Sequence, residues 1–343
     1  MHHGASNRLI LLLATLGGIC LTVVLHSHFS YWQAYNSGDL LKLHQETLSG
    51  TRDAPWQYRI LIDHAAALVS ELSGREIRYA YTLFDAASLV FVAAFLVWQY
   101  RCRDEKEDVS GVLALSYTGL FAFGSLWLPY YYQLPYTLPS CAYVAASLWL
   151  YEAGKKSESG LAWALLACAM IGLSIVQSFN RAEVVVALGA GLALQALHRR
   201  SSAAFIIGAA CAAAGALIQL WLAHVMFPNA PYPYKTGLEM FAFNVSRPLS
   251  LVIFLLFISP LFALWPARRH KAVDMARDLH VLAAFAVQVL FCWVAGKIDE
   301  VRIFAPFYFP LIPMMAAALA GIGRQDRRQA PHALAEPQGR PPT

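Results

Sequence analysis

The chain has 343 residues, of which 58% are apolar and 14% are charged. Soluble globular proteins carry about a quarter charged residues, so these few charges cannot cover the water-exposed surface of a soluble chain. The composition excludes an ordinary soluble enzyme and indicates a polytopic membrane protein. The formal net charge of +5 does not favour a nucleic-acid partner, because in a membrane protein the positions of the charges matter more than their sum.

The apolar segments predict an all-α fold, a bundle of about ten transmembrane helices. A helix needs about 20 mostly apolar residues to cross the hydrocarbon layer. Ten segments approach this requirement: 9–27, 79–100, 109–128, 136–152, 161–178, 183–197, 203–226, 249–265, 279–296 and 303–322. The first is too long for a signal-peptide core and lacks a clean cleavage site, so we interpret it as a retained span.

The connections between these segments differ in charge. Most Lys and Arg residues fall on alternate connections, among them Arg103, Lys155, Lys156, Arg199 and Arg200. The positive-inside rule then places both termini in the cytoplasm of a cell bounded by this membrane, which we take to be a bacterial inner membrane. We expect one integral membrane domain over 1–323 and a disordered cytoplasmic tail over 324–343, because the tail is polar and rich in proline.

The connections on the opposite, outer side mix aromatic residues, prolines and charges of both signs. An aromatic belt accounts for Trp and Tyr at a membrane surface, but not for ionised groups. Such groups are costly at a membrane unless they are partnered, and they mark functional sites. We therefore expect the outer charges to meet in one pocket: Asp39, Arg59, Asp63, Arg181, Glu183, Lys297, Asp299, Glu300 and Arg302.

The largest outer connection, 28–78, predicts two short amphipathic helices at the membrane interface. Ser37 is a candidate N-cap for a helix over 38–48 that Gly50 ends. Pro55 suits the first turn of a second helix, which runs through Leu72 to a stop at Gly74. In that helix an apolar stripe is formed by Leu61, Ala65, Leu68 and Leu72.

A retained first span followed by a long outer loop with an early acidic residue resembles the GT-C superfamily of polytopic glycosyltransferases. The matching acidic position is Asp39 in Tyr35-Asn36-Ser37-Gly38-Asp39. Further points of similarity are the segment Trp56-Gln57-Tyr58-Arg59 and the late Asp299-Glu300-Val301-Arg302 before an aromatic and proline-rich run. The likeness covers most of the chain, but the adjacent acidic pair of many members is missing.

The resemblance implies transfer of a sugar from a polyprenyl-phosphate donor to a glycan, lipid or protein acceptor on the extracytoplasmic side. Such a reaction needs a base for the acceptor hydroxyl and fixed positive charge for the departing phosphate. Asp39 is the first candidate for the base and Asp63 the second. The residues expected to bind substrate are Arg59, Arg181, Glu183, Lys297, Glu300 and Arg302, with Trp56, Tyr131 and Tyr132 as flat aromatic faces.

No organic cofactor is required by this chemistry. A metal is not obligatory either, since no nucleotide pyrophosphate has to be neutralised, although the sequence leaves a divalent ion open. The histidines of the outer loop have no compact metal-ligand spacing, and the six cysteines show no CxxC pattern.

Each charged residue also has a purely structural interpretation. Asp39 favours a helix N-terminus by its charge alone. Arg59 and Asp63 are four residues apart and suit a surface ion pair, and Arg181 and Glu183 suit a cap at a short turn. Asp85, inside the second span, is expected to face the bundle and hydrogen-bond to a neighbouring helix.

Two other classes of function remain open. A transporter or flippase of a lipid or small solute is the first alternative, although transporters place polar groups near the midplane at broken helices of two related halves. The second is a non-catalytic subunit of a membrane complex. The triplet Asn244-Val245-Ser246 matches an N-glycosylation pattern, which we expect to be incidental.

Overall fold

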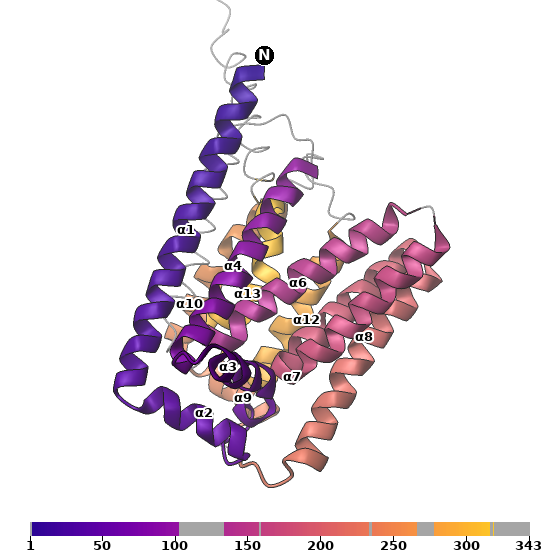
Figure 1. The fold of residues 1–343 in the computed structure, drawn as a ribbon. Helices are drawn as coiled ribbons and strands as arrows, with labels where there is room; N and C mark the ends of the chain where they lie inside the picture. The colour runs from indigo at the N-terminus through magenta and orange to yellow at the C-terminus, as the bar shows by residue number, and fades with distance from the viewer. Residues whose placement is uncertain are drawn as a thin grey trace, which may run out of the picture.

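The computed structural model describes residues 2–102, 134–157, 159–232, 235–265, 278–315 and 318, and all regular structure within them is helical. The prediction of an all-α fold is confirmed for this part of the chain. The elements in chain order are α1 (His2–Asn36), α2 (Asp39–Ser49), η1 (Trp56–Tyr58), α3 (Ile60–Ser73), α4 (Ile77–Cys102), α6 (Leu134–Lys155), α7 (Gly160–Arg199), α8 (Ser202–Trp221), η3 (Leu222–Met226), α9 (Leu238–Val245), α10 (Pro248–Ile258), η4 (Ser259–Ala263), α12 (Leu279–Ala295), η5 (Val301–Phe304), α13 (Ala305–Tyr308) and η6 (Phe309–Leu311) (Figure 1).

Four helices in the described residues are long and apolar enough to cross a membrane, and a fifth is added if the bent pair α9–α10 counts as one span. The four lie in α1, α4, α7 and α8–η3. The predicted segment 109–128 and the tail 324–343 lie outside the described residues. The described part of the last predicted segment, 303–315, is a succession of short 3-10 and α-helical stretches, among them η5, α13 and η6, in which Pro306, Pro310 and Pro313 recur.

The long element α7 is folded back on itself at Arg181, whose backbone is extended (φ −148°, ψ 85°). Tyr151 of α6 contacts Trp163, with ring centroids 6.4 Å apart, and also donates a hydrogen bond to Gln195 at 3.2 Å. A straight helix would separate Trp163 from Gln195 by about 48 Å. The two legs of α7 therefore run antiparallel, and they correspond to the predicted segments 161–178 and 183–197.

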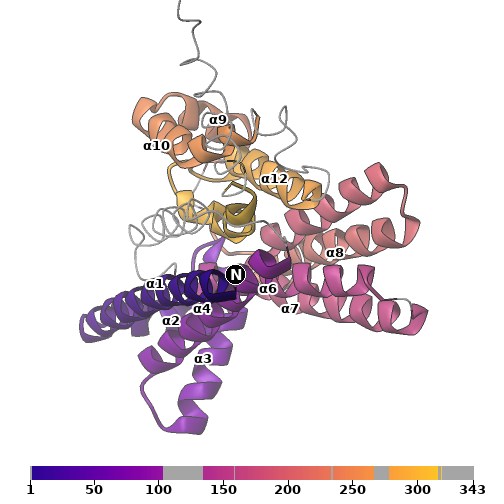
Figure 2. The same cartoon turned by 90° about the horizontal axis from the view of Figure 1, so that it is seen from above.

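The second leg of α7 is flanked by α8 and α12, which pack against different faces of it (Figure 2). A Cβ at Gly189 would stand 2.4 Å from the backbone nitrogen of Ala212 in α8. A Cβ at Gly191 would stand 2.2 Å from the carbonyl oxygen of His280 in α12. The two glycines are about 200° apart around the helix axis, so the absence of side chains lets two neighbours approach closely from different directions.

The ends of the helices separate into two groups. Lys155, His280 and the last turns of α7 lie together at one end. The Lys155 Nζ is 4.9 Å from the centre of the Tyr151 ring, and Tyr151 also lies 5.6 Å from the His280 ring and hydrogen-bonds to Gln195. The other end carries α2, α3 and α9 (Figure 1). Of the basic residues, Lys155 and Arg199 thus lie at the end opposite α2 and α3.

The first outer loop forms two helices, with three differences from prediction. The second helix was predicted to open at Pro55, but Pro55 precedes the short 3-10 helix η1 and α3 begins at Ile60. The residue before α2 is Gly38 in a left-handed conformation (φ 81°), and the Ser37 hydroxyl bonds to Ala34 and Asp39 and caps no helix N–H group. In α3 the face packed on the protein is Ile62, Asp63 and Ala66. Of the predicted stripe, Leu68 and Leu72 are exposed, while Leu61 and Ala65 are half-buried.

Candidate functional site

Charged residues from three distant parts of the chain meet in one cavity of about 90 Å³ at the end of the bundle that carries α2, α3 and α9. Its walls include Trp56 and Arg59 from the first outer loop, Arg181 from the turn of α7, and Lys297, Glu300 and Arg302 from the segment after α12. We call this cavity the cationic pocket. Six of the predicted site residues therefore share one site, whereas Asp39, Asp63, Glu183 and Asp299, which were expected in the same pocket, do not line it.

The turn of α7 supplies the most buried charge of the pocket. The Arg181 side chain is 2% exposed, and its Nε donates to Glu183 Oε1 at 2.7 Å. A terminal nitrogen of Arg181 also donates to the carbonyl oxygen of Ile303 at 3.4 Å. The predicted contact between Arg181 and Glu183 is formed. The second bond, from Arg181 to Ile303, joins the α7 turn to the segment that follows α12.

Arg59 faces the same carboxylate from the first outer loop. Its terminal nitrogen lies 3.6 Å from Glu183 Oε1, and its guanidinium carbon lies 5.5 Å from the centre of the Tyr136 ring. Burial lowers the pKa of the Arg59 guanidinium, while the charge of Glu183 raises it. Since the ordinary pKa of arginine is above 12, Arg59 remains a cation at neutral pH.

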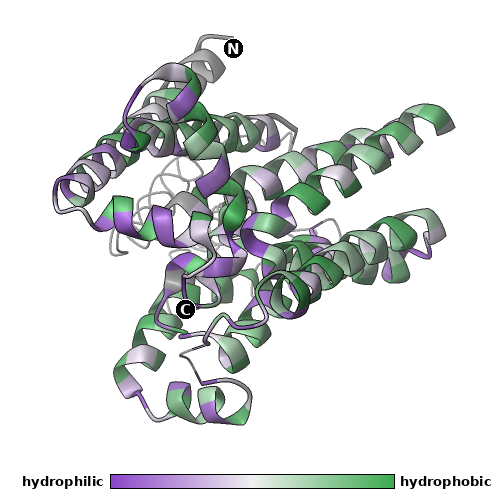
Figure 3. Cartoon of the chain, turned by 60° about the horizontal axis from the view of Figure 1, so that its bottom comes forward, coloured by the Kyte–Doolittle hydropathy of each residue, from purple (hydrophilic) through white to green (hydrophobic). Residues whose placement is uncertain are grey.

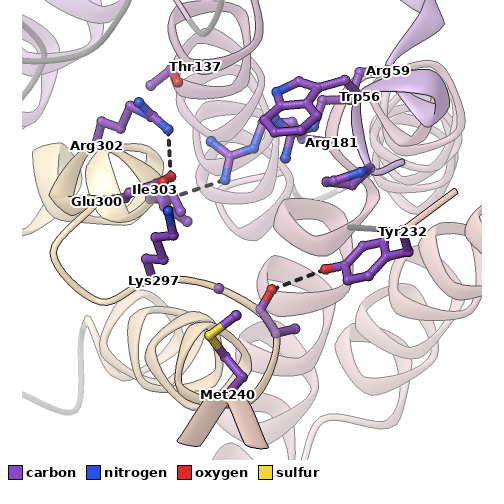
Figure 4. A pocket seen from close by; sticks show the side chains of 13 residues that line it. Trp56, Arg59, Thr137, Arg181, Tyr232, Met240, Lys297, Glu300, Arg302 and Ile303 are labelled. Atoms are coloured by element: carbon purple, nitrogen blue, oxygen red, sulfur yellow. Dashed lines mark hydrogen bonds and ion pairs between the residues drawn. The ribbon is translucent and has the colours of Figure 1, made fainter. Parts of the chain in front are cut away.

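The segment after α12 forms the facing wall of the pocket. Arg302 donates to Glu300 at 2.5 Å, and both side chains border the cavity. Figure 4 shows Lys297 and Arg302 on one side of the pocket, with Arg59 and Arg181 opposite. The arrangement presents several cationic groups to one small volume, which is the requirement for binding a phosphate or another multiply charged oxyanion.

The second predicted base, Asp63, is buried close to the pocket but does not line it. Its carboxylate accepts hydrogen bonds from the hydroxyls of Tyr81, at 2.5 Å, and Tyr136, at 2.9 Å, and His44 Nδ1 lies 3.4 Å away. Arg52 in turn donates to the Tyr136 hydroxyl at 2.8 Å. The predicted surface pair of Arg59 with Asp63 was wrong, because Arg59 turns to Glu183 and Asp63 turns into the protein.

The first predicted base, Asp39, is exposed at the start of α2, where it accepts a hydrogen bond from Ser37 at 2.8 Å. Asp39 is not among the residues that line the cationic pocket. Its surroundings fit the alternative interpretation as a charge at a helix N-terminus. Tyr131 and Tyr132, predicted as aromatic faces, lie outside the described residues.

A larger, mostly apolar cavity of about 490 Å³ adjoins the cationic pocket. Arg59, Tyr232 and Ile303 border both cavities. The larger cavity continues along the second leg of α7 between α8 and α12, and its walls include Val186, Ala216, Leu220, Phe291 and Ala295. We call it the apolar groove.

The apolar groove opens at the side of the bundle. Leu220 on α8 and Phe291 on α12 are exposed and stand on its two walls. Figure 3 shows that hydrophobic residues predominate along the helices that extend away from the end of the bundle with α2, α3 and α9. The groove thus has exposed apolar rims on apolar helices, and Arg59 lies where it meets the cationic pocket.

Several residues of the site were missed by sequence reasoning. Thr137, Tyr232, Met240 and Gly296 line the cationic pocket. Nothing in their local sequence indicates this, because each is an uncharged residue brought to the site by packing. Asp85 behaves as predicted: it is buried and accepts hydrogen bonds from Ser27 and from Tyr31 on α1.

Within the described residues, no group of three or more His, Cys, Asp or Glu side chains is arranged to hold a metal ion. Comparison of the chain with protein-family models, curated proteins and solved structures finds no match. The site must therefore be interpreted from its own geometry.

Proposed function

We propose that this protein is a membrane glycosyltransferase that transfers a sugar from a polyprenyl-phosphate donor to an acceptor hydroxyl on the extracytoplasmic side. The observation that carries the proposal is the junction of the cationic pocket with the apolar groove. A lipid phosphate has the matching division, an anionic head on a hydrocarbon chain. The likeness of the chain to GT-C glycosyltransferases gives the class of reaction, and it rests on analogy of architecture.

The charges of the pocket suit a departing phosphate. Four cations border it, Arg59, Arg181, Lys297 and Arg302, against the carboxylates Glu183 and Glu300. This formal excess of two positive charges faces a phosphodiester that carries one negative charge before the sugar leaves and up to two afterwards. Interactions that strengthen as charge develops lower the barrier, which is the principle of electrostatic catalysis.

The apolar groove suits the chain of the donor. The chain of a donor in the bilayer is already out of water, and lipid tails are about as apolar as the walls of the groove. The groove therefore holds and orients the chain at little cost, and the affinity comes from the charges that bind the phosphate. The phosphate then lies at the mouth of the groove beside Arg59. The sugar extends into the polar side of the site, towards Trp56 and Glu300.

For the base we propose Glu300 in place of Asp39. Glu300 is the carboxylate among the residues that line the cationic pocket, whereas Asp39 is exposed elsewhere. The acceptor oxygen forms a bond to the anomeric carbon as the bond from that carbon to the phosphate oxygen breaks. The acceptor proton passes to Glu300, and polyprenyl phosphate leaves with the bonding electron pair.

The test is sugar transfer by the purified protein in lipid nanodiscs from polyprenyl-phosphate-linked hexoses. We expect release of polyprenyl phosphate by the unmodified protein and a loss of roughly 10- to 100-fold in Arg181→Gln, the effect of removing a charge-assisted hydrogen bond. Asp39→Asn is the matched control and should retain full activity.

Cleavage of none of the donors would contradict the proposal. If the same lipids instead cross the bilayer of proteoliposomes intact, and Arg181→Gln abolishes that movement, the protein is a carrier. This outcome is distinguishable because no bond to the sugar is broken.

A further inference from the structure

Lys297 and Glu300 lie between the end of α12 at Ala295 and the start of η5 at Val301, where the chain has no regular helix, and Arg302 follows in η5. Buried backbone groups outside helices still need hydrogen-bond partners. The position of these three charged side chains therefore depends on whatever holds this backbone.

The amide side chain of Asn244 in α9 makes three hydrogen bonds to this backbone. Its Nδ2 donates to the carbonyl oxygens of Trp293, at 3.2 Å, and Gly296, at 2.9 Å. Its Oδ1 accepts from the backbone N–H of Ile298 at 3.3 Å. One side chain, 1% exposed, thus joins the last turn of α12 to the loop on both sides of Lys297.

Neighbouring residues of the same region make matching bonds. The Gly237 N–H donates to the carbonyl oxygen of Val294 at 2.7 Å, and the Ser250 hydroxyl donates to Asp299 at 2.8 Å. The region from α9 to the start of α10 therefore braces the loop at successive points. Within this brace, Asn244 alone supplies hydrogen-bond donors to two backbone carbonyl groups and an acceptor to one backbone N–H group.

The orientation of α9 explains why Asn244 is available. Met240 and Asn244, one helical turn apart, form its buried face, and Met240 lines the cationic pocket. Leu238, Phe241 and Val245 form an exposed apolar face. Because Asn244 is buried and its amide is fully engaged, the Asn244-Val245-Ser246 pattern cannot carry a glycan in the folded protein.

We propose that Asn244 is a positioning residue that sets the affinity of the cationic pocket for the lipid phosphate. It touches no substrate and acts through the backbone of 293–298, which places Lys297 and the Glu300–Arg302 pair opposite Arg59 and Arg181. This inference rests on the proposed function, since it concerns the same pocket.

The experiment compares Asn244→Asp and Ser250→Ala with Ser246→Ala. The Asp variant keeps an acceptor for Ile298 but loses both donated bonds and brings negative charge to two carbonyl oxygens. Ser250→Ala removes a single bond at the other end of the brace and is the milder change. Ser246→Ala is the matched control, because it lies beside Asn244, is exposed and also destroys the glycosylation pattern.

The measurements are the dissociation constant of farnesyl phosphate, the KM for the sugar donor and thermal unfolding, each in nanodiscs. We expect both constants to rise roughly tenfold in Asn244→Asp and two- to threefold in Ser250→Ala, and to stay unchanged in Ser246→Ala. A residue that only stabilised the fold would lower the unfolding temperature and the active fraction, but would leave the KM of the folded molecules unchanged.

The outcomes separate the inference from the proposed function. Sugar transfer by the unmodified protein with an unaltered KM in Asn244→Asp overturns the inference alone. Asn244-dependent binding of farnesyl phosphate without any sugar transfer supports the inference and overturns the glycosyltransferase. If the unmodified protein neither binds the lipid nor transfers sugar, both are overturned.

Discussion

Replacing Glu183 by Gln tests whether Arg59 and Arg181 can bind an external anion. Glu183 is the shared partner of Arg181, at 2.7 Å, and Arg59, at 3.6 Å. Glutamine has nearly the same shape but no charge. The substitution therefore leaves two guanidinium groups facing one another without the carboxylate that holds them together.

The expected cost follows from the burial of the three groups. Breaking a fully buried ion pair costs about 3–5 kcal/mol. The Arg181 side chain is 2% exposed, but those of Arg59 and Glu183 are 20% and 16% exposed, so water screens part of the loss and about 2–3 kcal/mol is reasonable. At roughly 2 °C per kcal/mol for a chain of this size, the unfolding temperature should fall by about 4–6 °C.

Binding of a phosphate should restore part of the stability lost in Glu183→Gln. We expect farnesyl phosphate to raise the unfolding temperature of Glu183→Gln more than that of the unmodified protein, because a ligand that binds only the folded state stabilises it and here also supplies the missing negative charge. Thermal unfolding in nanodiscs with and without the lipid measures both effects. Equal shifts of the unfolding temperature in the two proteins would refute the inference that Arg59 and Arg181 bind the phosphate of an external ligand. Farnesol is the uncharged control.

Three further changes test other parts of the structure. Asp63→Asn should lower the unfolding temperature, measured in nanodiscs, because an amide cannot accept both tyrosine hydroxyls without presenting a donor to one of them; an unchanged temperature would contradict the buried network. Ala216→Trp should fill the apolar groove and weaken binding of farnesyl phosphate at least tenfold while leaving inorganic phosphate binding unchanged, and equal losses for the two ligands would show that the groove holds no chain. Gly189→Val should prevent folding, seen as loss of a monodisperse peak in detergent, because its Cβ would stand 2.4 Å from the backbone of Ala212.

The arrangement of the pocket also bears on the direction of substrate entry. Under the proposed function, the donor would approach from the side through the apolar groove between α8 and α12, whereas Trp56 and Glu300 line the cationic pocket. An acceptor that arrives from the aqueous face would meet the sugar there and not the hydrocarbon chain. Under the proposed function, the lipid and the acceptor therefore reach the reacting centre by different routes.

Much of the architecture was predictable because it depends on local sequence. Apolar length and helix-stop residues are read over one segment at a time, so the helices of the first outer loop, their ends at Gly50 and Gly74, and the break of α7 near Arg181 could be inferred. The gathering of Arg59, Arg181, Lys297, Glu300 and Arg302 also followed, since alternating spans bring every second connection to the same end of a bundle.

The partners of those charges depended on tertiary structure. Sequence spacing paired Arg59 with Asp63, yet the rotation of α3 buries Asp63 against Tyr81 and Tyr136 and leaves Arg59 facing Glu183. The role of Asn244 was equally hidden, because its partners are backbone atoms of a distant loop. Periodicity indicates which side of a helix is apolar. The packing of remote helices decides which polar groups are buried away from water, and buried polar groups need hydrogen-bond or ionic partners.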